Sequence, residues 1–276
     1  MNPHTPSPSS MFDMVRTFWE RRSIIQKMTV REVIGRYRGS VMGLAWSFFN
    51  PILLLVVYTF IFGVIFKSRW GNTETHDTGE FAIIIFSGMI VHGLFAECFN
   101  RAPGQIVGNP NYVKKIIFPL EILPWISMGA ALFHTAISWF VLLVAELLLK
   151  GSIPWTAILF PVVLFPLVLL TMGFSWFLAA TGVYFRDISQ LTGIITTVLM
   201  FLSPMFYPMT AVSEQYRYLL YLNPLTFIIE TSRGVLIWGT LPSIVPLASY
   251  YLLSIVVAWA GFWWFQKTRK GFADVL

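Results

Sequence analysis

Charged side chains are rare in the apolar stretches of this chain, so those that occur there are the first candidates for chemistry. An ionised group away from water costs free energy, and it usually marks a function or a local partner. Glu97 precedes Arg101 by four residues, and Glu146 precedes Lys150 by four. An acid placed four residues before a base stabilises a helix. We therefore expect both pairs to be structural.

The remaining reactive side chains do not form a pattern that would bind a metal ion or catalyse a reaction. His92 and His134 are far apart, and hydrogen bonds between helices are a sufficient role for them. His76 and Asp77 are adjacent but stand in a polar stretch, where we expect them to be solvated. Cys98 is the only cysteine, which excludes a disulfide within the chain and a thiolate cluster. We expect no catalytic, cofactor or metal site.

The composition shows that lipid surrounds most of the chain. Of the 276 residues, 56% are hydrophobic and only 12% are charged, and the mean hydropathy is +0.69. The net charge of +6 could suit nucleic acid. However, the basic residues gather at the ends of apolar segments, where they match anionic lipid headgroups, so we expect no nucleic-acid partner. The first ten residues are polar, and we expect no cleaved signal peptide.

The apolar segments predict an all-α integral membrane protein with six spans, since about 20 helical residues cross about 30 Å of hydrocarbon. Of the 19 Lys and Arg residues, fourteen fall on the side of the two termini and five on the other side. By the positive-inside rule, both termini are expected in the cytoplasm, with the chain in a bacterial inner membrane. The expected spans lie at about 41–66, 81–99, 124–149, 155–184, 188–205 and 241–265.

A basic amphipathic segment precedes the first span. Thr29 and Glu32 have the spacing of a capping box, and apolar residues follow at helical intervals. We expect a helix on the inner membrane surface over 29–38, with a possible start near Met11; a solvated basic helix is the alternative. We therefore divide the chain into a cytoplasmic segment, 1–28, and a transmembrane domain, 29–276. Asn50 and Pro51 predict a kink in the first span. The charged residues of the interface helix are Arg31, Glu32, Arg36 and Arg38.

Two further regions have an unusual composition. The stretch between about 206 and 240 is apolar in part but too short and too charged to cross fully, which favours a re-entrant or interfacial helix pair on the external side. Aromatic residues cluster at the ends of the spans. Belts at the lipid interface explain most of them, and the alternative is a pore wall on which sugar rings could slide. The candidate channel aromatics are Trp46, Phe49, Phe201, Phe206 and Tyr207.

Four motifs in order support a resemblance to a known family. They read REVIGRYRGSVMGLAWSFFNP at 31–51, NPNYVKKIIFPLE at 109–121, YFRDI at 184–188 and YLNPLTFIIETSR at 221–233. From about Thr29 to the C-terminus, the chain resembles the membrane-spanning permease subunits of type-2 ABC exporters for polysaccharides. Within that family it is more similar to O-antigen and teichoic-acid exporters than to capsule exporters.

The resemblance implies a homodimeric channel that moves an undecaprenyl-linked polysaccharide outward: O-antigen first, with teichoic acid or capsule as alternatives. The chain would not be an enzyme. It carries no G-x-x-x-x-G-K-[ST] loop and has no room for a nucleotide-binding domain, so ATP and magnesium would be bound by two copies of a cytoplasmic ATPase subunit.

The resemblance also implies roles for particular residues. The loop over 109–119 would couple the chain to the ATPase, and the turn at 184–188 would make a smaller contact. A short helix from Asn223 would form an external gate, although a Glu230–Arg233 pair could equally be an ordinary surface ion pair. The implied coupling residues are Asn109, Pro110, Tyr112, Lys114, Lys115, Phe118, Pro119, Arg186 and Asp187, and the implied gate residues are Asn223, Pro224, Glu230 and Arg233.

Two other classes of protein remain as alternatives. A polytopic membrane enzyme that modifies lipid-linked sugars would need paired carboxylates or a His/Asp cluster at one membrane face, which the sequence does not show. A secondary transporter would show inverted repeats and unpaired charges in mid-span, and His134 is the only hint of that kind.

Overall fold

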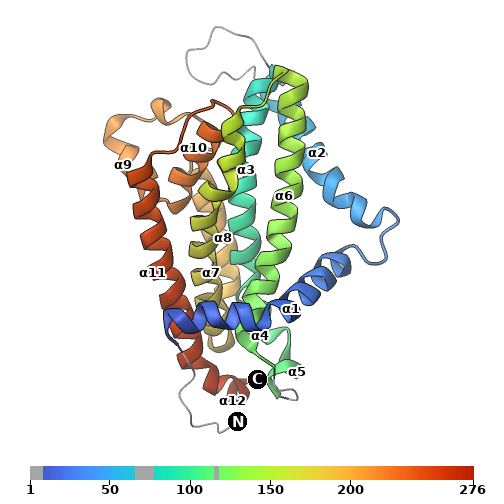
Figure 1. Cartoon of the computed structure of the whole chain (residues 1–276), viewed down its shortest axis with the longest axis vertical. Helices are drawn as coiled ribbons and strands as arrows, with labels where there is room; N and C mark the ends of the chain where they lie inside the picture. The colour runs from blue at the N-terminus through green and yellow to red at the C-terminus, as the bar shows by residue number, and fades with distance from the viewer. Residues whose placement is uncertain (1–8, 66–77, 115–117) are drawn as a thin grey trace.

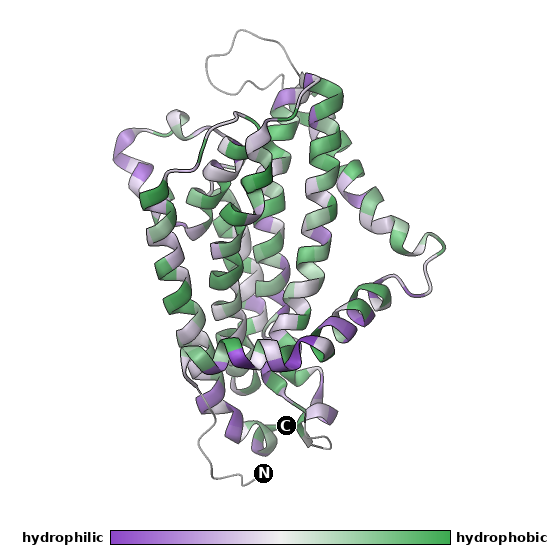
Figure 2. Ribbon diagram, in the orientation of Figure 1, coloured by the Kyte–Doolittle hydropathy of each residue, from purple (hydrophilic) through white to green (hydrophobic). Residues whose placement is uncertain are grey.

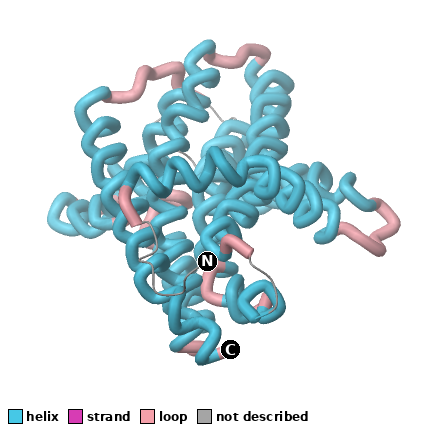
Figure 3. The backbone as a smooth tube through the Cα atoms, turned by 60° about the horizontal axis from the view of Figure 1, so that its bottom comes forward, coloured by secondary structure: helices cyan, strands magenta, loops and turns pink. Residues whose placement is uncertain are grey.

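The computed structural model describes residues 9–65, 78–114 and 118–276, and within these ranges the chain consists of helices and loops without a strand (Figure 3). Apart from α1, the long helices run alternately up and down (Figure 1). The α-helices are α1 (Met11–Arg36), α2 (Trp46–Tyr58), α3 (Thr78–Arg101), α4 (Gly104–Val107), α5 (Pro110–Lys114), α6 (Leu123–Lys150), α7 (Phe160–Tyr184), α8 (Ile188–Phe201), α9 (Glu214–Leu222), α10 (Pro224–Leu236), α11 (Ile244–Thr268) and α12 (Phe272–Val275).

Five helical segments of the described chain are long and apolar enough to cross a membrane, and hydropathy is high along them (Figure 2). They are Gly43–Phe62, Gly79–Arg101, Leu120–Lys150, Trp155–Tyr184 and Ile244–Val275. These five agree with predicted spans and confirm the all-helical class. The segment predicted at 188–205 differs, because α8 ends at Phe201 and has only 14 residues. Serine and proline at 203 and 204 end the apolar pattern there.

Helices α3 and α7 form the centre of the bundle. Helix α3 contacts α6, α7, α8 and α10, and α7 packs along α11. A glycine on each helix permits that close approach, because a Cβ atom on Gly173 or Gly261 would overlap the backbone of the opposite helix. Small residues at such crossings are the usual basis of helix association in membranes.

Helix α1 lies crosswise at the lower end of the bundle and packs mainly on α6 (Figure 1). It begins with a capping box between Ser10 and Asp13, in which the Asp13 amide donates to Ser10 Oγ over 3.1 Å. The capping box predicted at Thr29 is therefore wrong: α1 is continuous through that position. Thr29 instead packs against Gly129 of α6, where an added Cβ would lie 2.7 Å from Thr29 Oγ1.

The first apolar segment changes its helical geometry along its length. Helix α2 continues through Pro51, and a π-helical stretch, Thr59–Ile65, follows it. The hydroxyl of Thr59 donates to the carbonyl of Leu55 over 2.8 Å at this junction. The π-helical stretch begins eight residues after Pro51, the position at which the sequence predicts a kink.

Candidate functional site

Two crossed ion pairs fasten α1 to α3. Arg36 Nη1 lies 2.6 Å from Glu97 Oε1, and the guanidinium of Arg101 pairs with the carboxylate of Glu32. The predicted pair within α3 is present but longer, with 3.8 Å between Arg101 Nη1 and Glu97 Oε1. Both helices carry an acid four residues before an arginine, and the two sequences face each other with opposite charges. The matching spacing on the two helices could have indicated in the sequence that α1 and α3 lie side by side.

His134 of α6 joins this cluster. Its Nδ1 lies 3.2 Å from Glu97 Oε2 and 3.1 Å from Arg36 Nη1, and its Nε2 lies 3.2 Å from the hydroxyl of Tyr37. The expectation that His134 makes hydrogen bonds between helices is therefore confirmed. Partial burial raises the pKa of Tyr37, so its hydroxyl stays protonated at neutral pH. The end of α1 is thus connected to both α3 and α6.

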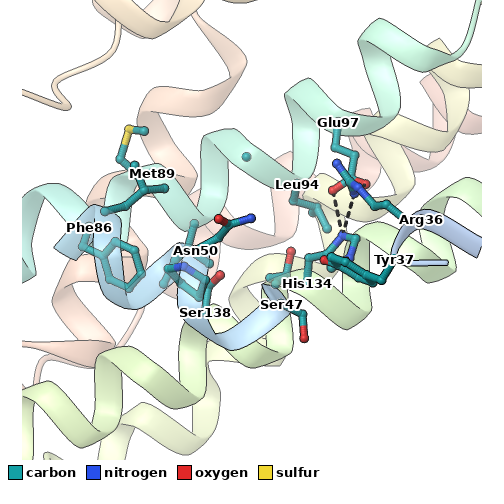
Figure 4. A pocket seen from close by; sticks show the side chains of 15 residues that line it. Arg36, Tyr37, Ser47, Asn50, Phe86, Met89, Leu94, Glu97, His134 and Ser138 are labelled. Atoms are coloured by element: carbon teal, nitrogen blue, oxygen red, sulfur yellow. Dashed lines mark hydrogen bonds and ion pairs between the residues drawn. The ribbon is translucent and has the colours of Figure 1, made fainter. Parts of the chain in front are cut away.

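A cavity of about 290 Å³ lies beside this cluster, between the end of α1, α2, α3 and α6 (Figure 4). Polar side chains come from all four elements, and apolar side chains from α2 and α3 close part of the wall. The lining residues that Figure 4 labels are Arg36, Tyr37, Ser47, Asn50, Phe86, Met89, Leu94, Glu97, His134 and Ser138.

The predicted coupling loop, 109–119, contains the short helix α5 and directly follows the short helix α4 at the same end of the bundle. The rings of Tyr112 and Phe118 stack with their centroids 4.4 Å apart. The side-chain amide of Asn109 donates to the backbone carbonyl of Gln105 over 2.9 Å. Arg31 Nη2 lies 3.5 Å from the Tyr112 hydroxyl. Pro110 begins α5, and Pro119 immediately precedes a 3-10 turn, Leu120–Ile122. The side chain of Lys114 and all of Lys115 lie outside what the structure describes.

The residues on either side of α4, α5 and this loop are fixed to the bundle. Pro103 sits so close to α7 that a Cβ on Gly182 would overlap its carbonyl oxygen. At the other end, the carbonyl of Glu121 accepts a hydrogen bond from Trp176 Nε1 over 3.0 Å. The carboxylate of Glu121 lies 2.9 Å from Arg269 Nη1, which follows α11. A displacement of the loop would therefore be transmitted to α7 and α11.

The second predicted contact also lies at this end. Arg186 and Asp187 are exposed in the turn between α7 and α8. Ser189, two residues further on, lines one cavity together with Arg31, Asn109 and Tyr112. The structure thus brings the interface helix, the longer loop and the shorter turn to one face of the chain.

The predicted gate residues lie at the opposite end, where two of them, Asn223 and Arg233, connect α10 to neighbouring segments. Arg233 of α10 is fully buried, so the alternative of a surface ion pair is wrong. Its guanidinium donates to the carbonyls of Ile84, Pro204 and Met205 over 3.2, 2.5 and 3.0 Å, and to Glu230 Oε1 over 2.6 Å. Arg233 thereby holds α10 against α3 and the segment after α8.

The N-terminus of α10 has the capping geometry that its sequence predicts. Asn223 Oδ1 accepts a hydrogen bond from the amide of Leu225 over 2.9 Å, and Pro224 occupies the first helical turn. The side-chain nitrogen of Asn223, Nδ2, also donates to Leu199 O and Ser203 Oγ over 2.8 and 2.9 Å. One side chain therefore caps α10 and fastens it to the end of α8.

The candidate channel aromatics fall into two separate clusters. Trp46 and Phe49 pack edge to face at the start of α2, with their ring centroids 5.5 Å apart. Phe201 and Phe206 have ring centroids 6.1 Å apart, and the Tyr207 hydroxyl donates to the carbonyl of Phe201 over 2.9 Å.

One predicted pair has a different partner. Lys150 Nζ lies 3.2 Å from Glu80 Oε1 of α3, whereas both carboxylate oxygens of Glu146 are buried without a hydrogen-bond partner among the described residues. The start of α3 lies beside the end of α6, a proximity that spacing within one helix does not reveal. In the described part of the chain, no three His, Cys, Asp or Glu residues form a group that could hold a metal ion.

Five apolar helices with charged elements gathered at one end define a multi-pass membrane protein. Residues 24–237 match the model of the ABC-2 type transporter family, and the chain belongs to that family. The family expected from the four motifs is thereby confirmed.

Relatives in the family cover almost the whole chain. The chain is 27% identical to the O-antigen export system permease protein RfbA of Myxococcus xanthus, over 96% of this chain and 99% of that protein. It is 23% identical to the protein of the same name from Klebsiella pneumoniae, over 90% and 93%. It is also 23% identical to the polysialic acid transport protein KpsM of Escherichia coli, over 90% and 95%.

Proposed function

We propose that this chain forms the transmembrane channel of an ATP-driven exporter that moves a lipid-linked polysaccharide, O-antigen first, across the bacterial inner membrane. The observation that carries this proposal is the similarity to an O-antigen export permease, which extends over nearly the whole length of both proteins. Membership of a transporter family supports it. Teichoic acid and capsule are the alternative cargoes. A membrane enzyme and a secondary transporter have no such support.

The proposed topology has six crossings with both termini in the cytoplasm. Helix α8 counts as the fifth crossing, because it begins at the lower end of the bundle and is followed by α9 at the upper end (Figure 1). Its apolar residues and those of the short segment that follows it would complete the span. Helices α9 and α10 then form the external gate, held to α3 and α8 by Arg233 and Asn223.

The proposed assembly is a homodimer with two copies of a cytoplasmic ATPase subunit, which bind ATP and magnesium. Helices α2 and α8 leave apolar side chains exposed in the single chain, for example Val56 at 58% and Ile194 at 61%. Apolar faces of this kind suit contact with a second copy or with lipid.

The ATPase would contact the lower end of the bundle, where the interface helix, α4, α5 and the turn at Arg186 and Asp187 meet. Movement of the loop would enter the bundle at the fixed points Gly182 and Glu121. It would also reach α1, because Arg31 lies next to Tyr112.

The test is replacement of Tyr112, Lys114 and Lys115 by alanine in the full chain, co-expressed with its ATPase. We expect export to stop while the permease still inserts and forms its dimer. The matched control is Trp155→Ala, which removes an aromatic side chain that is 69% exposed at the opposite end, and export should persist. Normal export by the triple variant would exclude this loop as the coupling element.

A further inference from the structure

The cavity between α1, α2, α3 and α6 is lined by polar groups for which the described part of the chain supplies no hydrogen bond. The amide of Asn50 and the hydroxyls of Thr135 and Ser138 line it, and none of the three has a hydrogen-bond partner among the described residues. Asn50 lies in the first apolar segment, Gly43–Phe62, and the other two lie in Leu120–Lys150. Thr135 is buried, Ser138 is partly buried and Asn50 is exposed in the single chain. Polar side chains within apolar spans are costly, and they commonly mark a ligand site.

The charges beside the cavity cancel one another. The guanidinium of Arg36 lies 2.6 Å from the carboxylate of Glu97, and His134 bridges the two groups. A phosphate placed here would meet the Glu97 carboxylate, which opposes its binding. A neutral ligand with several hydroxyls would instead find donors and acceptors on Asn50, Ser138 and Glu97.

The rest of the wall is apolar. Phe86, Met89 and Leu94 of α3 line one side of the cavity, and Leu54 of α2 lies on another. Figure 4 shows Asn50 and Ser138 close together, with Phe86 to one side of them and the Glu97–His134 cluster to the other. A pyranose ring presents hydroxyls at its rim and C–H groups on its faces, so it matches a cavity that combines convergent polar groups with an apolar wall.

We propose that this cavity binds a neutral sugar ring attached to a lipid chain, with Asn50 and Ser138 as its hydrogen-bonding residues. The site rests on the proposed export function and deepens it, because the sugar next to the lipid carrier is the unit that could enter between these apolar spans. The glycerol headgroup of a phospholipid shares the hydroxyl chemistry but lacks a ring face for Phe86 and Met89.

The experiment uses the full chain in phosphatidylcholine nanodiscs and a photoreactive dodecyl β-D-glucoside whose diazirine lies beside the sugar. We expect crosslinks in α2 and α6, and about fivefold less labelling in Asn50→Leu, because a lost hydrogen bond to a neutral group weakens binding by about two- to tenfold. Ser138→Ala is a second variant that removes only one oxygen. The control, Leu53→Ala, changes a residue of α2 that does not line the cavity, and labelling should persist.

Equal labelling in both cavity variants and the control, or equal labelling by a probe with a phosphoglycerol head, would overturn the proposal. The assay contains neither ATP nor the ATPase. A negative result would therefore remove the sugar site and leave the export function standing, whereas a failure of the export function would not change the labelling.

Discussion

Replacement of the buried Arg233 by methionine should destabilise the chain more than any change to an exposed ion pair. Methionine has a similar length but cannot donate hydrogen bonds. The substitution would leave the buried carbonyls of Ile84, Pro204 and Met205 and the partly exposed carboxylate of Glu230 without these donors. Removing one partner of a buried ion pair costs about 3 to 5 kcal/mol.

The expected loss for Arg233→Met is therefore about 4 kcal/mol of unfolding free energy. For a chain of this size, 1 kcal/mol corresponds to about 2 to 4 °C, so the thermal midpoint should fall by about 8 to 16 °C. Arg233→Lys keeps the charge but loses the planar guanidinium group. Its thermal midpoint should therefore lie between those of the methionine variant and the natural chain. Adding Glu230→Gln to Arg233→Met should recover part of the lost stability, because glutamine carries no charge that would need the arginine as its partner.

The assay is thermal unfolding of purified protein in one detergent, followed by tryptophan fluorescence. The matched control is Arg217→Met, which removes an arginine that is one-third exposed in α9 and lies 3.8 Å from the exposed Glu214. Such pairs contribute about 0 to 1 kcal/mol, so this midpoint should move by only a few degrees. Equal midpoints for the two methionine variants would refute the structural role assigned to Arg233.

Three further predictions concern other contacts of the bundle. Gly261→Ala should cost about 1 to 3 kcal/mol of stability because its Cβ would overlap the backbone of Gly173, whereas Gly193→Ala, with open space around it, should not destabilise; thermal midpoints test both. Phe272→Ala should cost about 3 to 5 kcal/mol and speed amide hydrogen exchange in α5, which contacts α12; unchanged exchange would contradict that contact. Glu97→Gln should lower the thermal midpoint by only a few degrees, since Arg36 is half-exposed; a larger fall would show that the cluster matters more than its exposure suggests.

Most of the fold was predictable from the sequence because hydropathy over about 20 residues depends on composition alone. Five of the six predicted spans agree with long helices, and Pro224 after Asn223 correctly marked the start of α10. Helix α8 was extended too far, because the apolar residues after Phe201 belong to a loop rather than to the helix.

The tertiary partners of charged residues were harder to predict. Spacing within one helix suggested Lys150 as the partner of Glu146, but Lys150 contacts Glu80 on another helix. Likewise, the burial of Arg233 depends on carbonyls that two separate segments provide, α3 and the residues after α8. One sequence does not state which helices lie side by side, so pairs between helices require the packing to be known. The matching acid–arginine spacings on α1 and α3 are the exception that a search for complementary patterns could have found.

Depletion of this chain in its bacterial host tests the proposed export function most directly. The measurement follows the undecaprenyl-linked polymer inside the cell and the same polymer at the cell surface. We expect the polymer to accumulate inside and to disappear from the surface. Expression of the natural chain should restore normal polymer levels at both places, whereas the variant with alanine at Tyr112, Lys114 and Lys115 should not. Normal surface polymer after depletion would contradict the proposal that this chain is the export channel.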